Sequence, residues 1–190
     1  MSRIVIIGAS TGGLPAAYEI KKILGRGHDV TVISNTENFH FVPSNPWVAV
    51  GWRKRKDISF PLKPYLEKKG IKFIAEAAQR IDTQRNEVTT TMGTVVPHDY
   101  LVIATGPKLA FEEIEGLGPE RNTVSICVVD HAEKAYEEYR KFIKDPGPIV
   151  VGATQGASCF GPAYEFAFIL ETDLRRRRFR KNIPITFVTS

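Results

Sequence analysis

The chain has 190 residues, of which 43% are hydrophobic and 25% are charged. This length and composition are typical of a globular protein with one well-buried domain, or with one domain and part of another. No stretch approaches the roughly 20 consecutive apolar residues that span a bilayer. The first residues, MSRIVIIG, begin a strand rather than a secretory signal. We therefore expect a cytoplasmic protein.

The formal net charge of +5 is concentrated in one segment, RRRRFRK at residues 175–181, which holds six basic residues. Cations at the end of a helix interact favourably with the negative end of its dipole, so a solvated helix terminus is the first interpretation. Attraction to anionic lipid head groups is the second. We expect no nucleic-acid partner, because no aromatic interleaving or recognised module accompanies the run.

The first pattern in the chain is a βαβ unit of about 30 residues. Residues 3–8 (RIVIIG) have the apolar run of a buried strand, and residues 14–25 (LPAAYEIKKILG) have apolar residues at helical spacing. The turn GASTGG joins them, and residues 28–34 (HDVTVIS) form the second strand. This is the structural context that a dinucleotide-binding glycine fingerprint requires.

The fingerprint positions are filled by Gly8, Ser10 and Gly13. In such a fold the first glycine makes the tight turn, the second lets backbone approach the pyrophosphate, and the third allows close packing of helix on strand. The serine adds bulk in the middle position, but its hydroxyl can donate to a phosphate oxygen. Ser34 and Asn35 stand where an acidic residue usually holds the ribose, and they can still hydrogen-bond hydroxyl groups.

Residues 35–66 are rich in aromatic residues and prolines, which exclude long regular elements. A long loop of this kind inside a compact domain is often functional. The patterns that follow predict a strand at 71–78, a β-hairpin at 86–96 around Met92-Gly93, and a buried strand at 99–107 that ends in a Gly-Pro stop.

The remaining residues predict a connector and a second βαβ unit. The connector spans 107–126, and the elements after it are a helix at 130–145 with Asp130 as N-cap, a strand at 146–153, a helix at 161–181 and a strand at 183–190. A two-stranded parallel sheet is not a stable end point by itself. We therefore expect the N-terminal part of a larger architecture, or a stand-alone remnant of one.

The two cysteines, Cys127 and Cys159, are separated by 31 residues. No CxxC or Cys/His ligand spacing occurs, so we predict no metal site, and a structural disulfide is not expected in the cytosol. Cys159 lies in a Gly-rich turn between strand and helix, in the segment IVVGATQGASCFGPAYE at 149–165. Turns of this kind bring backbone close to a cofactor or substrate, and the following helix dipole favours a thiolate.

A second signature, the ATG of Ala104-Thr105-Gly106, closes a predicted strand about 95 residues after the first glycines. The arrangement resembles the FAD-binding half of flavoproteins with two dinucleotide domains, in which ATG passes close to the cofactor. We therefore place FAD ahead of NAD at the first fingerprint.

Longer segments strengthen this resemblance. FVPSNPWVAVGW, YLVIATGPKLAFE, SICVVDHAE and GASCFGPAYEFAF together resemble the sulfide:quinone oxidoreductases of the flavin disulfide reductase superfamily. The similarity covers essentially the whole chain, and the two cysteine-bearing segments are its specific part. It implies FAD in the first domain, oxidation of sulfide at a cysteine pair beside the isoalloxazine, and quinone as electron acceptor.

The resemblance also implies roles for individual residues. The position of Cys127 can attach to, or lie beside, the flavin 8-methyl edge, and that of Cys159 belongs to the redox-active pair near the flavin C4a. His131 and Glu165 match positions proposed to manage protons. From the residues alone, the alternatives are that Cys127 is a buried strand cysteine, Cys159 an inert turn residue, His131 a surface residue and Glu165 an ordinary first-turn carboxylate.

Part of the family's machinery is missing from this sequence. The redox partner of Cys159, the quinone pocket and the amphipathic membrane-anchoring helices lie in a C-terminal portion in the family. We expect peripheral membrane attachment through such a portion, at the inner face of the cell membrane. The alternatives are a catalytically silent dinucleotide-binding module, an NADH:quinone oxidoreductase and a flavocytochrome-type sulfide dehydrogenase. The oligomeric state is open, with a homo-oligomer among the alternatives.

The predicted fold class is α/β, a Rossmann-like FAD-binding three-layer domain at 1–112, a connector with a helix at 113–146, and an incomplete second Rossmann-like domain at 147–190. The candidate catalytic residues are Cys159, Cys127, His131 and Glu165. The candidate contacts with FAD are Gly8, Ser10, Gly12, Gly13, Ser34, Asn35, Pro43, Ser44, Ala77, Ala78, Ala104, Thr105 and Gly106.

Overall fold

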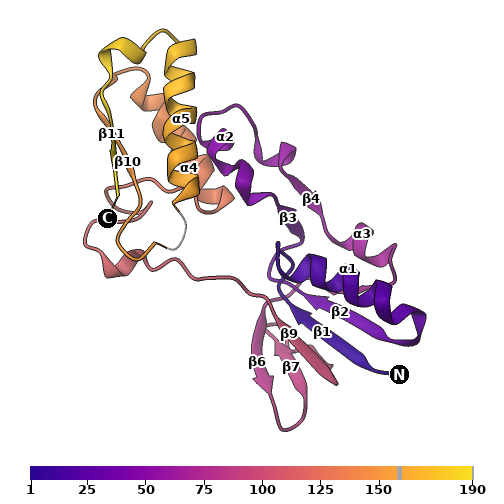
Figure 1. Cartoon of the computed structure of the whole chain (residues 1–190). Coiled ribbons are helices and arrows are strands. Elements are labelled where there is room, and N and C mark those ends of the chain that lie inside the picture. The colour runs from indigo at the N-terminus through magenta and orange to yellow at the C-terminus, as the bar shows by residue number, and fades with distance from the viewer. Residues whose placement is uncertain (158–159, 190) are drawn as a thin grey trace. The chain divides into compact units, whose positions relative to one another are not determined.

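The computed structural model describes residues 1–157 and 160–189 (Figure 1). The chain divides into two compact units. The first unit comprises Met1–His40 and Ser59–Leu109, and the second comprises Phe41–Ile58 and Ala110–Ser190. The domain boundaries expected from the sequence, after residues 112 and 146, stay a prediction. No helix in the described part of the chain is long and apolar enough to cross a bilayer.

The first unit contains a parallel sheet with the strand order β5-β2-β1-β9 (Figure 1). Its strands are β1 (Arg3–Ile7), β2 (Asp29–Ile33), β5 (Lys72–Ile74) and β9 (Tyr100–Ile103). The helix α1 (Gly13–Leu24) connects β1 to the parallel strand β2, and a 3-10 turn at Gly25–Gly27 follows it. The predicted βαβ unit is therefore confirmed.

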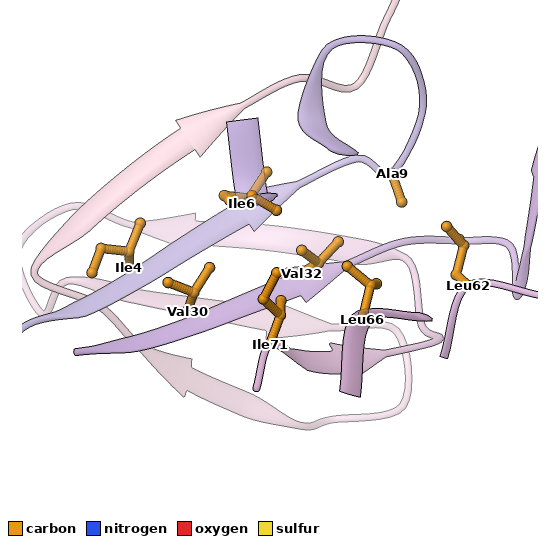
Figure 2. Close-up of a cluster of buried hydrophobic side chains, with 9 residues drawn as sticks. Ile4, Ile6, Ala9, Val30, Val32, Leu62, Leu66 and Ile71 are labelled. Carbon is orange, nitrogen blue, oxygen red and sulfur yellow. The ribbon is translucent and has the colours of Figure 1, made fainter. Parts of the chain in front are cut away.

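One face of this sheet is covered by helices. Alternate side chains of β1 and β2 point to that face, because successive side chains of a strand alternate between its two sides. Figure 2 shows them beside Ala9 and beside side chains in and around α3 (Lys63–Glu67). The buried members of this cluster are Ile4, Ile6, Ala9, Ala17, Val30, Val32, Leu62, Leu66 and Ile71.

The other face packs against an antiparallel sheet. That sheet has the order β6-β7-β8 and is formed by β6 (Ala78–Asp82), β7 (Glu87–Thr90) and β8 (Val95–Pro97). The intervening side chains of β1 and β2 meet it in a second buried cluster of Val5, Ile7, Ile33, Val88 and Val96. Helix, parallel sheet and antiparallel sheet therefore form three layers, and the hairpin predicted at 86–96 is confirmed.

Residues 35–66 contain only short elements, as the prolines indicated. They are β3 (Asn38–His40), a 3-10 turn at Val42–Ser44, α2 (Asn45–Ala49), a 3-10 turn at Arg55–Asp57, and β4 (Ser59–Pro61), with α3 beginning at Lys63. β3 pairs with β4 in an antiparallel ribbon. Phe39 and Phe60 stack on this ribbon with ring centroids 5.0 Å apart.

The second unit contains the parallel pair β10 (Ile149–Gly152) and β11 (Ile185–Val188), connected by α5 (Gly161–Arg176). The helix α4 (Val129–Phe142) precedes this pair, and α2 packs against both α4 and α5. Further 3-10 turns lie at Phe111–Glu113 and Arg180–Asn182. This second βαβ unit is the predicted start of another Rossmann-like domain, so the predicted fold class is confirmed.

The prediction of Asp130 as N-cap of α4 is wrong. Val128 holds that position with an extended backbone, no side-chain cap bond forms, and Asp130 lies in the first turn. The carboxylate of Asp130 accepts a hydrogen bond from Arg55, which also donates to Glu133 one turn further along α4. The carboxylate of Asp130, which the local sequence pattern assigned to the helix cap, therefore pairs with Arg55 from a distant segment instead.

Two other predicted elements differ from the structure. Residues 71–78 form two strands in different sheets, because β5 ends at Ile74 and β6 begins at Ala78. The helix predicted to reach residue 181 ends at Arg176, in a Schellman motif. There Arg178 has a φ of 66°, its N–H donates to the carbonyl of Arg175 at 3.0 Å, and the N–H of Phe179 donates to that of Leu174 at 2.9 Å.

A buried carboxylate ties three segments of the second unit together. Asp173 on α5 is 3% exposed. Its oxygens accept hydrogen bonds from Trp52 Nε1 at 2.7 Å, the Tyr139 hydroxyl at 2.6 Å and Arg177 Nε at 2.6 Å. Burial raises the pKa of Asp173, but these three donors outweigh burial and hold the pKa below its usual range. The segment 41–58, α4 and α5 are thus joined at one side chain.

We predict that Asp173→Asn destabilises the chain by about 3 kcal/mol near neutral pH, because an amide cannot accept all three donors. A carboxyl with a lowered pKa in the folded state stabilises above its unfolded pKa and loses that contribution as the pH falls through its folded pKa. The difference between wild type and variant should therefore shrink in acid. Urea unfolding across this pH range measures it, and a difference that is independent of pH would contradict the assignment.

Candidate functional site

The strands of the parallel sheet end together at one edge. Ile7 of β1 is in register with Ile33 of β2 and with Ile103 of β9, and Ile33 is in register with Ile74 of β5. Carboxyl edges of parallel sheets are where dinucleotides bind in this class of fold.

The residues that follow these strands continue the ladder by one bond each. The N–H of Gly8 donates to Ile33 at 2.8 Å, that of Ser34 to Ile74 at 3.0 Å, and that of Ala104 to Ile7 at 2.8 Å. The structure therefore brings together three separate sequence signals, which are the glycine turn, the Ser34-Asn35 pair and the ATG segment.

Close backbone contacts require glycine at two positions of the turn. Gly8 has a φ of +104°, and a Cβ placed on it would lie 2.2 Å from the carbonyl oxygen of Ala104. A Cβ on Gly13 would lie 1.9 Å from the carbonyl oxygen of Gly8. A side chain at either position would separate the turn from its neighbours. Gly12 differs, because a Cβ there would make only an ordinary contact, 3.6 Å from the Ala104 side chain.

The start of α1 suits an anionic group. Gly12 holds the N-cap position without a side-chain cap bond, and the first turn contains no acidic residue. Ser10, Thr11 and Gly12 are exposed. The N–H groups of a helix start and the positive end of its dipole attract phosphates. The backbone that approaches closely at Gly8 and Gly13 and this uncapped helix start therefore fit the pyrophosphate of FAD.

The other predicted cofactor contacts in the first unit differ in how far they are buried. Ser34 is buried, and its Oγ accepts a hydrogen bond from the Thr36 N–H at 3.3 Å, whereas Asn35 is exposed. Thr105 and Gly106 are exposed beyond the end of β9. Ala77 and Ala78 are half-buried where the antiparallel sheet begins, and the Ala77 carbonyl accepts the Thr91 N–H at 2.8 Å.

Pro43 and Ser44 belong to the second unit, so their contact with a cofactor at the edge described above stays a prediction. Pro43 is exposed. Ser44 is fully buried, and its Oγ accepts a hydrogen bond from the Arg53 guanidinium, which itself lies 4.8 Å from the ring centroid of Trp47.

The structure connects Cys127 with His131 through a residue that the sequence analysis missed. Ser125 Oγ lies 3.3 Å from Nδ1 of His131 and accepts the N–H of Cys127 at 3.2 Å. Cys127 is an exposed free thiol, so the alternative of a buried strand cysteine is wrong. The ring of Phe111 lies 5.6 Å from that of His131. The only sequence signal for Ser125 was its place two residues before the cysteine.

The other two candidate catalytic residues are less constrained by the structure. Glu165 is half-buried on α5, beyond the first turn that the sequence assigned to it. Cys159 lies outside the described residues, and its pairing with a second sulfur stays a prediction.

Comparison with known proteins identifies the class. The family model described as pyridine nucleotide-disulphide oxidoreductase matches residues 2–155, so the chain belongs to this family. Membership confirms FAD as the expected cofactor.

Individual relatives show which members of this family the chain resembles. The chain is 46% identical to the sulfide-quinone reductase of Aquifex aeolicus over 187 residues, which cover 98% of this chain and 43% of that protein. The crystal structure of the Aquifex aeolicus sulfide:quinone oxidoreductase matches 100% of this chain and 43% of its own, with a TM-score of 0.92 and 44% identity. The expected resemblance to sulfide:quinone oxidoreductases is thereby confirmed.

A more distant relative is named for a different reaction. The chain is 31% identical to the type II NADH:quinone oxidoreductase NdhA of Mycobacterium tuberculosis over 129 residues, which cover 64% of this chain and 27% of that protein. The chain spans less than half the length of each of these relatives.

We predict that Gly8→Ala lowers the free energy of unfolding by about 2 kcal/mol or more, because it adds both a positive-φ strain and a clash with the Ala104 carbonyl. Gly12→Ala is the matched control in the same turn and should change stability by less than about 0.5 kcal/mol. Urea unfolding of both variants measures this difference. Equal stabilities of the two variants would show that the turn does not depend on the Gly8 contact.

Proposed function

We propose that the protein containing this chain oxidises sulfide with bound FAD and delivers the electrons to a quinone. The observation that supports this most directly is the 46% identity to the sulfide-quinone reductase over 98% of the chain. The carboxyl edge of the parallel sheet supports it independently, because its close backbone contacts fit a dinucleotide.

In this proposal the first unit holds the cofactor. The N–H groups of the turn and helix start, at Ser10, Gly12 and Gly13, bind the pyrophosphate. The side chains of Ser34 and Asn35 hydrogen-bond the ribose. The remaining contacts in this unit are made by Ala77, Ala78, Ala104, Thr105 and Gly106, and Pro43 and Ser44 of the second unit are further proposed contacts. When bound, FAD supplies the capacity to take up two electrons and release them to a second substrate.

The net reaction is HS⁻ + quinone + H⁺ → S⁰ + quinol, in which sulfide loses two electrons and the quinone gains two electrons and two protons. Cys159 is one sulfur of the redox-active pair, and Cys127 provides a further thiol. His131 takes up or releases the proton, held by Ser125 through Nδ1 so that Nε2 is left for the exchange. Glu165 is a second proton-transfer group.

The quinone determines where this reaction takes place. Quinones with apolar tails dissolve in the bilayer, so the protein must meet the membrane surface. We propose peripheral attachment at the inner face of the cell membrane through polypeptide outside the present chain.

A second candidate is an NADH:quinone oxidoreductase, favoured by the 31% identity to NdhA. That reaction transfers a hydride from a nicotinamide and does not require Cys159. The dependence of turnover on this cysteine therefore separates the two candidates.

We predict that the chain takes up FAD and that Gly8→Ala, even at temperatures where it is folded, does not. The reason is that a displaced turn cannot bring its N–H groups to the pyrophosphate. The visible absorption band of flavin after gel filtration measures uptake, with the unsubstituted chain as the control. A folded wild-type chain that takes up no flavin would favour the silent binding module.

A chimera with the carboxyl-terminal part of the Aquifex aeolicus protein tests the reaction. We predict that anaerobic sulfide bleaches the flavin band of the FAD-loaded chimera and that a soluble quinone restores it. Cys159→Ser in the chimera should retain FAD but stay oxidised with sulfide. Bleaching by NADH rather than sulfide, with Cys159→Ser unaffected, would contradict sulfide oxidation and support the second candidate.

A further inference from the structure

The peptide group between Ile126 and Cys127 is held at both of its polar atoms by side chains. The carbonyl oxygen of Ile126 accepts a hydrogen bond from Asn45 Nδ2 at 3.0 Å. The N–H of Cys127, in the same peptide plane, donates to Ser125 Oγ at 3.2 Å. The direction of the Cys127 side chain is set by the backbone dihedrals on either side of its Cα, so fixing this plane restricts where the thiol can point.

Asn45 is an unusual residue to find in this place. It is fully buried at the start of α2, and in sequence it lies 81 residues from Ile126. Its Oδ1 is buried without a hydrogen-bond partner in the described part of the chain. A buried amide oxygen left unpaired costs free energy, so an apolar side chain would serve packing alone better. The Nδ2 donor of the same amide accounts for an asparagine at this position, because it bonds the Ile126 carbonyl.

On either side of this peptide, one side chain is packed in the protein and the next is exposed. Ile126 packs against the buried cluster that α2 and α4 form, which includes Val48 and Ala132. Cys127, the next residue, is exposed. Ser125 also contacts His131 on the first turn of α4. The segment is therefore attached to α2 through Asn45 and to α4 through Ser125, with the thiol left accessible between them.

We propose that Asn45 is a positioning residue for Cys127, acting by holding the Ile126–Cys127 peptide in one orientation. The functional meaning rests on the proposed function, in which the thiol must face its reaction partners. In this proposal Asn45 acts through the peptide that it holds, not by contact with a substrate. Its role is to remove the rotation of one peptide plane that would otherwise redirect the sulfur.

The test measures the reactivity of the thiol in the full chain. Cys159→Ser leaves Cys127 as the only cysteine, and its alkylation by iodoacetamide is followed by intact mass. Asn45→Ala in this background should accelerate alkylation about fivefold, the factor that corresponds to one lost hydrogen bond, because the released peptide plane lets the exposed sulfur turn further into solvent. Asn45→Asp keeps the volume but removes the donor when ionised, and it should accelerate alkylation as well.

Val48→Ala is the matched control, because Val48 is buried on the same helix and packs against the same cluster as Ile126. It should lower the unfolding midpoint without changing the alkylation rate by more than about twofold. Rates at or below wild type in both Asn45 variants, or an equal acceleration in Val48→Ala, would overturn the proposal. The assay uses neither flavin nor sulfide, so its failure would leave the proposed function standing, and failure of the sulfide assay would leave this result standing.

Discussion

The carbonyl oxygen of Ala104 lies where a side chain on Gly8 would have to go, and the carbonyl of Gly8 lies where a side chain on Gly13 would go. Because of these contacts, the end of β9, the end of β1 and the start of α1 pack so closely that no side chain fits between their backbones. The start of α1, which has no side-chain cap bond, therefore lies at the edge where β2 and β9 also end. In the proposed function, this close packing brings the phosphate contacts and the ribose contacts of FAD to the same edge of the sheet.

The second unit depends on a different kind of constraint. The segment 41–58 has little regular structure of its own, yet polar bonds join it to the helices α4 and α5 of that unit. Trp52 donates to Asp173 on α5, Arg55 pairs with Glu133 on α4, and Asn45 holds the carbonyl of Ile126. The bonds made by the buried side chains of Asp173 and Asn45 specify one arrangement, because each is costly to leave unmade. A long irregular loop can in this way position an exposed thiol.

Much of the fold could be predicted because its signals are local. The apolar run at 3–8, the glycine turn and the helical spacing of α1 lie within a few residues of one another, and each forms as predicted. The N-cap of α4 and the switch from β5 to β6 could not be predicted in this way. Asp130 is held by Arg55 from another segment, and the same apolar pattern runs through two sheets at 71–78.

The residues of the candidate site likewise fall into a group that local motifs predict and a group that they do not. The turn and the ATG segment are short motifs with a known geometry, and parallel pairing necessarily brings their strand ends to one edge. Asn45, Ser125 and Asp173 carry no motif, because their importance arises from partners that only the folded chain supplies. Such bonds link residues as far as 121 positions apart, as between Trp52 and Asp173, and no pattern within one segment encodes them.

In the proposed function the turn beginning at Gly8 holds the pyrophosphate of FAD. A crystal structure of the chain soaked or co-crystallised with FAD tests it most directly. We expect pyrophosphate oxygens within hydrogen-bond distance of the backbone N–H groups at the start of α1, with the adenosine ribose beside Ser34 and Asn35. A dinucleotide bound with its phosphates away from this helix start, while the turn keeps its contact with Ala104, would show that the turn does not hold the pyrophosphate.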